Sequence, residues 1–164
     1  MARTVAFQQY SLREYEGGMA AALETLTSMG VFTIEPWCGA VPANPEEGTS
    51  IEALRQRFSD AGVRLTCGHM TVDEFDTRYT DWRDLLRGFD STDWVVPFAR
   101  AETLEAWLAL IPTFEPLADQ LEADGLSLGY HNHHMELEQF GEKRVMEHLL
   151  DAMPRLRGQF HIGQ

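Results

Sequence analysis

Residues 126–137 read LSLGYHNHHMEL. The first five residues are mostly apolar and β-prone, which predicts a buried strand. That strand is followed by the polar run His131, Asn132, His133, His134 and Glu136. Three of the six histidines of the chain therefore lie within four positions, directly after a strand. Ligands bind at the carboxyl ends of strands in parallel α/β folds, so this stretch predicts such a fold with a site at that edge.

Strand-like and helix-like segments alternate on both sides of this stretch. The predicted strands are 5–10, 31–37, 63–67, 93–98, 126–130 and 159–162. The predicted helices are 19–29, 51–61, about 80–89, about 103–123 and 142–152, and Pro112 and Pro116 should break or kink the fourth. This spacing is typical of βαβ units with a parallel sheet. The pattern alone leaves a doubly wound sheet and a (β/α) barrel as alternatives.

Several helix ends are marked by residues that favour them. Ser50 is the predicted N-cap of the second helix, and Glu52 lies in its first turn. Gly30, Gly62 and Gly125 follow the predicted ends of three helices.

The length and charge of the chain limit the classes of function. A length of 164 residues fits one domain, and a net charge of −13 disfavours nucleic acid as a partner. We find no apolar run long enough for a signal peptide or a membrane span. Cys38 and Cys67 are too few for a disulfide framework and are interpreted as reduced core thiols. These features predict a cytoplasmic protein with no membrane partner.

Polar side chains follow most of the predicted strands. They are Gln9, Tyr10, Ser11 and Arg13 after the first, Glu35 after the second, His69 after the third, the run that ends in Glu136 after the fifth, and His161 in the last. Glu35 is notable because a carboxylate in a buried strand needs a partner. Side chains alternate along an extended chain, so His131 and His133 should share one face. We expect these two imidazoles, Glu35 and His69 to converge at the carboxyl end of one sheet.

Four segments resemble a known superfamily. LGYHNHHMEL resembles the Y-H-N-H-x-x-E-F segment of the sugar phosphate isomerase/epimerase superfamily, the xylose-isomerase-like TIM barrels. QQYSLRE at 8–14 is similar to its first-strand Q-x-Y-S-x-R-[DE] segment. TIEPW at 33–37 resembles its V-E-x-W segment, and QFHIGQ at 159–164 resembles its sixth-strand F-x-x-D-x-G. The matches run along the whole chain in the family's order.

The resemblance implies a fold, a chemistry and a cofactor. The fold would be a (β/α) barrel of the TIM type, with residues 1–164 as a single partial domain of about six strands that lacks the last two βα units. The chemistry would be metal-assisted proton transfer next to the carbonyl of a sugar or sugar phosphate. The cofactor would be a divalent ion, Mn, Zn or Mg, at the carboxyl ends of the strands. His161 stands where the family carries an acid.

The strand-end positions and the resemblance together give the candidate site. The predicted catalytic residues are His133, His131 and Glu35. The predicted substrate-binding residues are Tyr10, Arg13, His69 and Asn132. The predicted metal ligands are Glu136 and His161.

Three interpretations of the function stay open. The chain is a sugar isomerase or epimerase, a sugar lyase or dehydratase of the same superfamily, or a truncated or degenerate barrel without independent catalysis. Because the late-strand metal ligands of the family have no counterpart, we expect weak metal binding or none. An open barrel would expose strand edges and apolar interior, which predicts a homodimer.

Overall fold

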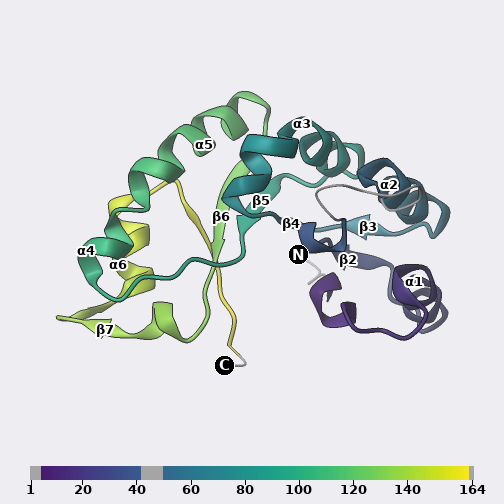
Figure 1. Ribbon diagram of the computed structural model, residues 1–164, viewed down its shortest axis with the longest axis horizontal. Helices are drawn as coiled ribbons and strands as arrows, with labels where there is room; N and C mark the ends of the chain where they lie inside the picture. The colour runs from purple at the N-terminus through teal and green to yellow at the C-terminus, as the bar shows by residue number, and fades with distance from the viewer. Residues whose placement is uncertain (1–4, 42–49, 163–164) are drawn as a thin grey trace. The chain divides into compact units, whose positions relative to one another are not determined.

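A computed structural model describes residues 5–41 and 50–162 (Figure 1). The chain forms two compact units. The described residues of Met1–His69 and Asp73–Thr92 make the first unit, and those of Met70–Val72 and Asp93–Gln164 make the second.

The first unit is built around a parallel sheet in the order β1-β2-β3. Its strands and helices are β1 (Phe7–Gln8), η1 (Gln9–Leu12), α1 (Gly18–Ser28), β2 (Thr33–Glu35), η2 (Cys38–Ala40), α2 (Ile51–Asp60), β3 (Arg64–Leu65), β4 (Gly68–His69) and α3 (Val72–Gly88). Phe7 lies opposite Ile34, and Gln8 lies opposite Glu35. Beyond β2, Trp37 forms an isolated parallel bridge with His69.

The second unit contains the parallel strands β5, β6 and β9, with β6 in the middle. Its elements are β5 (Asp93–Val96), α4 (Leu104–Leu108), α5 (Ile111–Ala123), β6 (Ser127–His131), η3 (Met135–Leu137), β7 (Gln139–Phe140), β8 (Lys143–Arg144), α6 (Val145–Ala152) and β9 (Arg157–Gln159). β7 and β8 form an antiparallel hairpin. α5 packs on β6, and α6 packs on α4 and β9.

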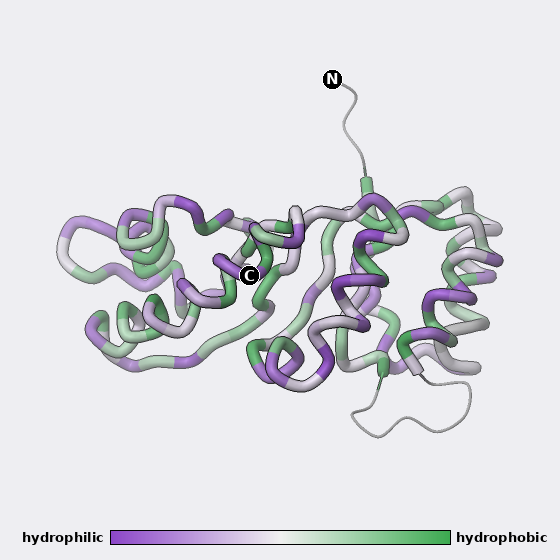
Figure 2. The backbone as a smooth tube through the Cα atoms, turned by 90° about the horizontal axis from the view of Figure 1, so that it is seen from above, coloured by the Kyte–Doolittle hydropathy of each residue, from purple (hydrophilic) through white to green (hydrophobic). Residues whose placement is uncertain are grey.

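Apolar side chains between strands and helices form the core of each unit. Ile34, Leu54 and Phe58 are buried in the first unit, and Leu121 and Leu128 are buried in the second. Figure 2 shows hydrophobic and hydrophilic residues mixed along the helices, as expected for helices that cover a sheet with one face. The predicted α/β class with parallel strands is confirmed.

Local signals in the sequence account for several boundaries. Ser50 is the N-cap of α2, because its side chain accepts a 3.1 Å hydrogen bond from the Ala53 N–H. Gly125 follows α5 with a φ of 77°, in the left-handed region that favours glycine. The long fourth helix is divided into α4 and α5 just before Pro112, which lies in the first turn of α5. Pro116 lies inside α5 without ending it.

α3 is kinked at Arg78, whose φ of −137° and ψ of 27° are not helical, and its part after the kink agrees with the helix predicted from about 80. The part before the kink, from Val72, with Asp73 and Glu74 in its first turn, was not predicted. Two further predicted boundaries were wrong. The chain between 138 and 144 forms the β7–β8 hairpin, and Gly141 with a φ of 67° takes the turn. The helix predicted from 142 therefore begins at Val145. The last strand lies at Arg157–Gln159, so His161 follows it.

Further expectations concern the cysteines and the membrane. Cys38 and Cys67 are both buried and free of disulfides, as predicted. Within 5–41 and 50–162, no helix combines the length and apolar character of a membrane span.

The predicted homodimer can be tested at the end of the second sheet. β9 pairs with β6 and is an edge of that sheet within the described residues. Phe160 and Ile162 follow β9 with 62% and 96% of their surface exposed. We predict that light scattering at micromolar concentration shows a dimer and that Phe160→Asp weakens it by placing charge in the contact. Met29→Asp, at another exposed apolar position, is the control. A monomeric wild type would contradict the prediction.

Candidate active site

Glu35, at the carboxyl end of β2, is the centre of a hydrogen-bonded cluster in the first unit. Its Oε1 accepts a hydrogen bond from the Gln8 amide nitrogen and contacts His69 Nε2 at 2.8 Å. Its Oε2 accepts from the Cys67 thiol at 3.1 Å. The side chain keeps 15% of its surface exposed. The carboxylate is therefore supplied with donors and still accessible.

The backbone fixes the direction in which these hydrogen bonds run. The Tyr10 N–H donates to Gln8 Oε1 at 2.9 Å, so the amide nitrogen of Gln8 must point the other way. That nitrogen lies 3.1 Å from His69 Nδ1, and an amide nitrogen can only donate. We infer that Nδ1 is the acceptor and that the ring hydrogen of His69 lies on Nε2, directed at Glu35.

His69 and Glu35 therefore have different roles in this cluster. Both ring nitrogens of His69 are engaged within it, and the ring is buried. This arrangement suits His69 to orienting Glu35, and its predicted role in substrate binding stays a prediction. Glu35 is the group in the cluster that can accept a proton from a ligand.

Aromatic residues lie next to this cluster. The rings of Tyr10 and Trp37 meet edge to face, with centroids 4.9 Å apart. The Arg13 guanidinium lies over the Tyr10 ring, with Cζ 4.2 Å from the centroid, and donates to the Tyr10 carbonyl at 3.2 Å. Tyr10 is 45% exposed. The predicted binding residues Tyr10 and Arg13 thus lie together near Glu35.

A second cluster, in the second unit, contains three imidazoles. The ring centroid of His131 lies 5.1 Å from that of His133 and 5.3 Å from that of His161. His131, the last residue of β6, shares a 2.8 Å hydrogen bond between its Nδ1 and Gln159 Oε1 on β9. The rings of Phe98 and His133 also meet edge to face, with centroids 5.5 Å apart. The His131 and His133 rings are thus neighbours, and their catalytic role stays a prediction.

Asn132 and His134 lie differently. Asn132 is fully buried, and its amide donates to the His133 and His161 carbonyls and accepts from the His161 N–H. It therefore ties the end of β6 to the segment after β9. His134 is exposed. Binding of substrate by Asn132 stays a prediction.

Glu136 lies in η3 and is fully buried. Its Oε1 accepts from the Tyr130 hydroxyl at 2.6 Å, and its Oε2 accepts from the His133 N–H at 2.8 Å. Burial and the hydrogen bond to this carboxylate raise the pKa of Tyr130 far above its ordinary value. Glu136 thus holds the loop that presents the imidazoles.

The described residues do not fit the metal site that the resemblance implies. Within 5–41 and 50–162, no three His, Cys, Asp or Glu side chains are arranged to hold an ion. Both oxygens of Glu136 are already engaged inside the protein. The predicted ligand roles of Glu136 and His161 stay predictions.

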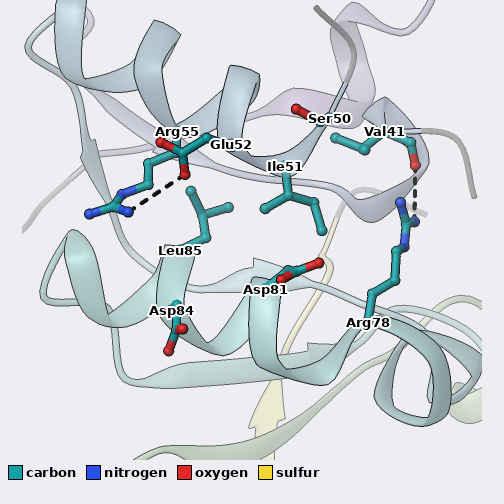
Figure 3. Close-up of a pocket in the computed structure, with 9 residues that line it drawn as sticks. All are labelled: Val41, Ser50, Ile51, Glu52, Arg55, Arg78, Asp81, Asp84 and Leu85. Carbon is teal, nitrogen blue, oxygen red and sulfur yellow. Dashed lines mark hydrogen bonds and ion pairs between the residues drawn. The ribbon is translucent and has the colours of Figure 1, made fainter. Parts of the chain in front are cut away.

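The first unit also has a pocket of about 270 Å³ between α2 and α3 (Figure 3). Some of its charged groups already have hydrogen-bond or ion-pair partners within the protein. Arg78 donates to the Val41 carbonyl at 3.0 Å, and Arg55 pairs with Glu52 at 3.6 Å. No residue of the Glu35 cluster lines this pocket, so the strand ends remain the candidate site.

Sequence reasoning missed several residues of the two clusters. They are Gln8 and Cys67 in the first unit and Phe98 and Gln159 in the second. Gln8 and Gln159 lie within strands, where an amide gives no signal of its own. Phe98 follows β5 and could have been included with the other strand-end residues. The convergence of Glu35 and His69 with His131 and His133 at the carboxyl end of one sheet stays a prediction.

The parallel α/β units with polar strand ends are matched by solved barrel structures. No protein-family model matches the chain. No curated protein matches it either. A sugar phosphate isomerase/epimerase from Parabacteroides distasonis matches with a TM-score of 0.70 and 19% identity, over 98% of this chain and 67% of that one.

Two further structures support the same fold. A xylose isomerase-like TIM barrel protein from Mycobacterium smegmatis, in complex with magnesium, has a TM-score of 0.59 and 21% identity over 87% of this chain and 55% of its own. A D-psicose 3-epimerase, in the presence of D-fructose, has a TM-score of 0.58 and 11% identity over 94% and 62%. The chain therefore has the fold of part of a xylose-isomerase-like TIM barrel, and the resemblance in its motifs is confirmed at the level of the fold.

The buried Tyr130–Glu136 pair predicts how stability depends on pH. In the unfolded chain the phenol ionises near its ordinary pKa of 10.0, whereas the folded chain keeps it protonated. The free energy of unfolding should therefore fall above about pH 10, by up to about 1.4 kcal/mol per pH unit. Tyr130→Phe should remove this part of the slope.

Urea unfolding at about pH 9 and about pH 11 measures it. Tyr15→Phe, which changes a partly exposed tyrosine, is the control. An unchanged slope in Tyr130→Phe would show that Tyr130 is not held protonated.

Proposed function

We propose that this chain is a sugar or sugar phosphate isomerase/epimerase-like protein that moves a proton next to the sugar carbonyl. The observation that carries the proposal is the accessible Glu35 carboxylate, held at the end of a parallel strand by Gln8, Cys67 and His69. The sugar isomerase and epimerase structures with the same fold support it.

The proposed reaction uses Glu35 as the base. Glu35 takes the proton from the carbon next to the carbonyl, and the electron pair of the broken C–H bond forms an enediolate. Return of the proton to the former carbonyl carbon, with the hydroxyl proton moving from one enediolate oxygen to the other, gives the isomer. Return to the same carbon from the opposite face gives the epimer.

The other predicted residues complete the proposal. The catalytic roles of His131 and His133 stay predictions from the sequence. Gln8 and His69 orient Glu35, and Tyr10 and Arg13 contact the sugar. In this proposal the residues belong to a single domain of the partial-barrel type.

The test is the exchange of carbon-bound hydrogen with solvent. We predict that the wild type exchanges a proton of D-fructose or D-fructose 6-phosphate for deuterium and that Glu35→Gln slows this about 100-fold or more. Glu52→Gln, an exposed glutamate of α2, should leave the rate unchanged. NMR follows the loss of the proton signal.

Other results would favour the alternatives. Loss of water from the sugar without back-exchange would identify a lyase or dehydratase. Sugar binding without any exchange in the wild type would contradict the proposed function and favour a barrel without catalysis.

Metal binding is proposed to be weak. A divalent metal would polarise a sugar carbonyl, but the described side chains do not assemble a site for it. We predict less than one Mn²⁺ per chain after equilibrium dialysis and metal analysis. A stoichiometric ion that is lost in His161→Ala but retained in His148→Ala would contradict this prediction and support the predicted ligand role of His161.

A further inference from the structure

We propose that Tyr10 and Trp37 form an aromatic platform that takes the C–H face of the substrate sugar, and that Gly39 sets the position of this platform. The inference rests on the proposed function and names residues that determine how the sugar is held. Trp37 ends the TIEPW motif without a role assigned from the sequence, and Gly39 lies outside the motifs.

The two rings of the platform are held by contacts on several sides. They meet at an interplanar angle of 88°, with Arg13 over the Tyr10 ring. The Trp37 N–H donates to Gln9 Oε1 at 2.9 Å, and the Gln9 side chain is fully buried. Tyr10 is nevertheless 45% exposed, and Trp37 is half-buried. The platform is thus held by these contacts and is in contact with solvent.

Gly39 gives the indole of Trp37 its place. A Cβ at Gly39 would overlap the indole and would lie 2.5 Å from its Cε2 and Cη2 atoms. The backbone of Gly39 is outside the left-handed region, so the clash that alanine would meet comes from the indole and not from the backbone. Gly39→Ala should therefore move the Trp37 ring while leaving the tryptophan in the chain.

The platform is joined to the base through the backbone. Trp37 is two residues beyond Glu35 and bridges to His69, whose N–H donates to the Pro36 carbonyl at 2.8 Å. The Tyr10 N–H holds the Gln8 amide that binds Glu35. A sugar ring on the platform would therefore lie at a fixed position relative to the Glu35 carboxylate.

The chemistry of the platform fits a carbohydrate. One face of a sugar ring presents C–H groups, and aromatic rings offer both apolar area and a negative face to them. Free sugars and sugar phosphates share this feature. The Arg13 guanidinium is stacked on the Tyr10 ring, donates to the Tyr10 carbonyl and lies 3.6 Å from Glu14. Arg13 therefore also holds the Tyr10 ring of the platform in place.

Tryptophan fluorescence provides a direct test. The chain has four tryptophans, and Trp82, Trp94 and Trp107 are 0%, 0% and 1% exposed. A change in emission on adding sugar would therefore report on Trp37. The probes are D-fructose and D-fructose 6-phosphate, with glycerol as the control that has no ring. A similar affinity for both sugars assigns the contact to the ring, and a signal for the phosphate alone would overturn the proposal.

Substitutions show whether the Trp37 ring binds the sugar or only lies close to it. Trp37→Phe should lose the emission change but retain sugar binding by calorimetry. Trp37→Ala and Gly39→Ala should each weaken binding about 3- to 10-fold, as expected for the loss of one aromatic contact. Gly88→Ala is the matched control, because a Cβ there meets Arg55 only at ordinary distances of 3.7 Å and more.

Circular dichroism and thermal unfolding must be the same in Gly39→Ala and Gly88→Ala for the comparison to hold. Unchanged affinity in folded Trp37→Ala and Gly39→Ala would overturn the platform. Glu35→Gln should keep the emission change while losing hydrogen exchange. Sugar binding that depends on Trp37 without any exchange in the wild type would support the platform and contradict the proposed catalysis.

Discussion

A carboxylate at the end of a buried strand must be given hydrogen-bond donors, because water is no longer there to provide them. Glu35 obtains its donors from β1, β4 and the segment between β3 and β4. Gln8 lies directly opposite Glu35 in the parallel register. A slip of one residue between these strands would turn Gln8 to the other face and leave the carboxylate short of a donor. The sheet register and the site therefore depend on the same pairing.

The second unit satisfies a buried carboxylate in another way. Glu136 receives the Tyr130 hydroxyl and the His133 N–H, and it is completely removed from solvent. Glu35 keeps part of its surface exposed. The two glutamates thus have different consequences for function. Glu35 can meet a ligand, whereas Glu136 fixes the loop that carries His133, next to His131 at the end of β6.

Sequence patterns predicted the strands and the α/β class because burial in parallel sheets produces short apolar runs. Ser50 and Gly125 marked their helix ends by side-chain and backbone chemistry that acts within a few residues. The part of α3 before its kink at Arg78 was missed because polar residues such as Asp73 and Glu74 fit a loop as well as a first turn. Glu35, His69 and the imidazoles were found as strand-end residues. Their partners Gln8 and Gln159 became visible only once the strands were paired.

The contact between Trp37 and Gly39 also constrains how this surface can evolve. An indole at position 37 and any side chain at position 39 compete for the same space. The two positions should therefore change together among relatives of this chain, with glycine at 39 wherever tryptophan stands at 37 and larger residues at 39 only where 37 is small. The order of substitutions matters, since a side chain gained at position 39 while the indole is still present displaces the ring from its place on this surface.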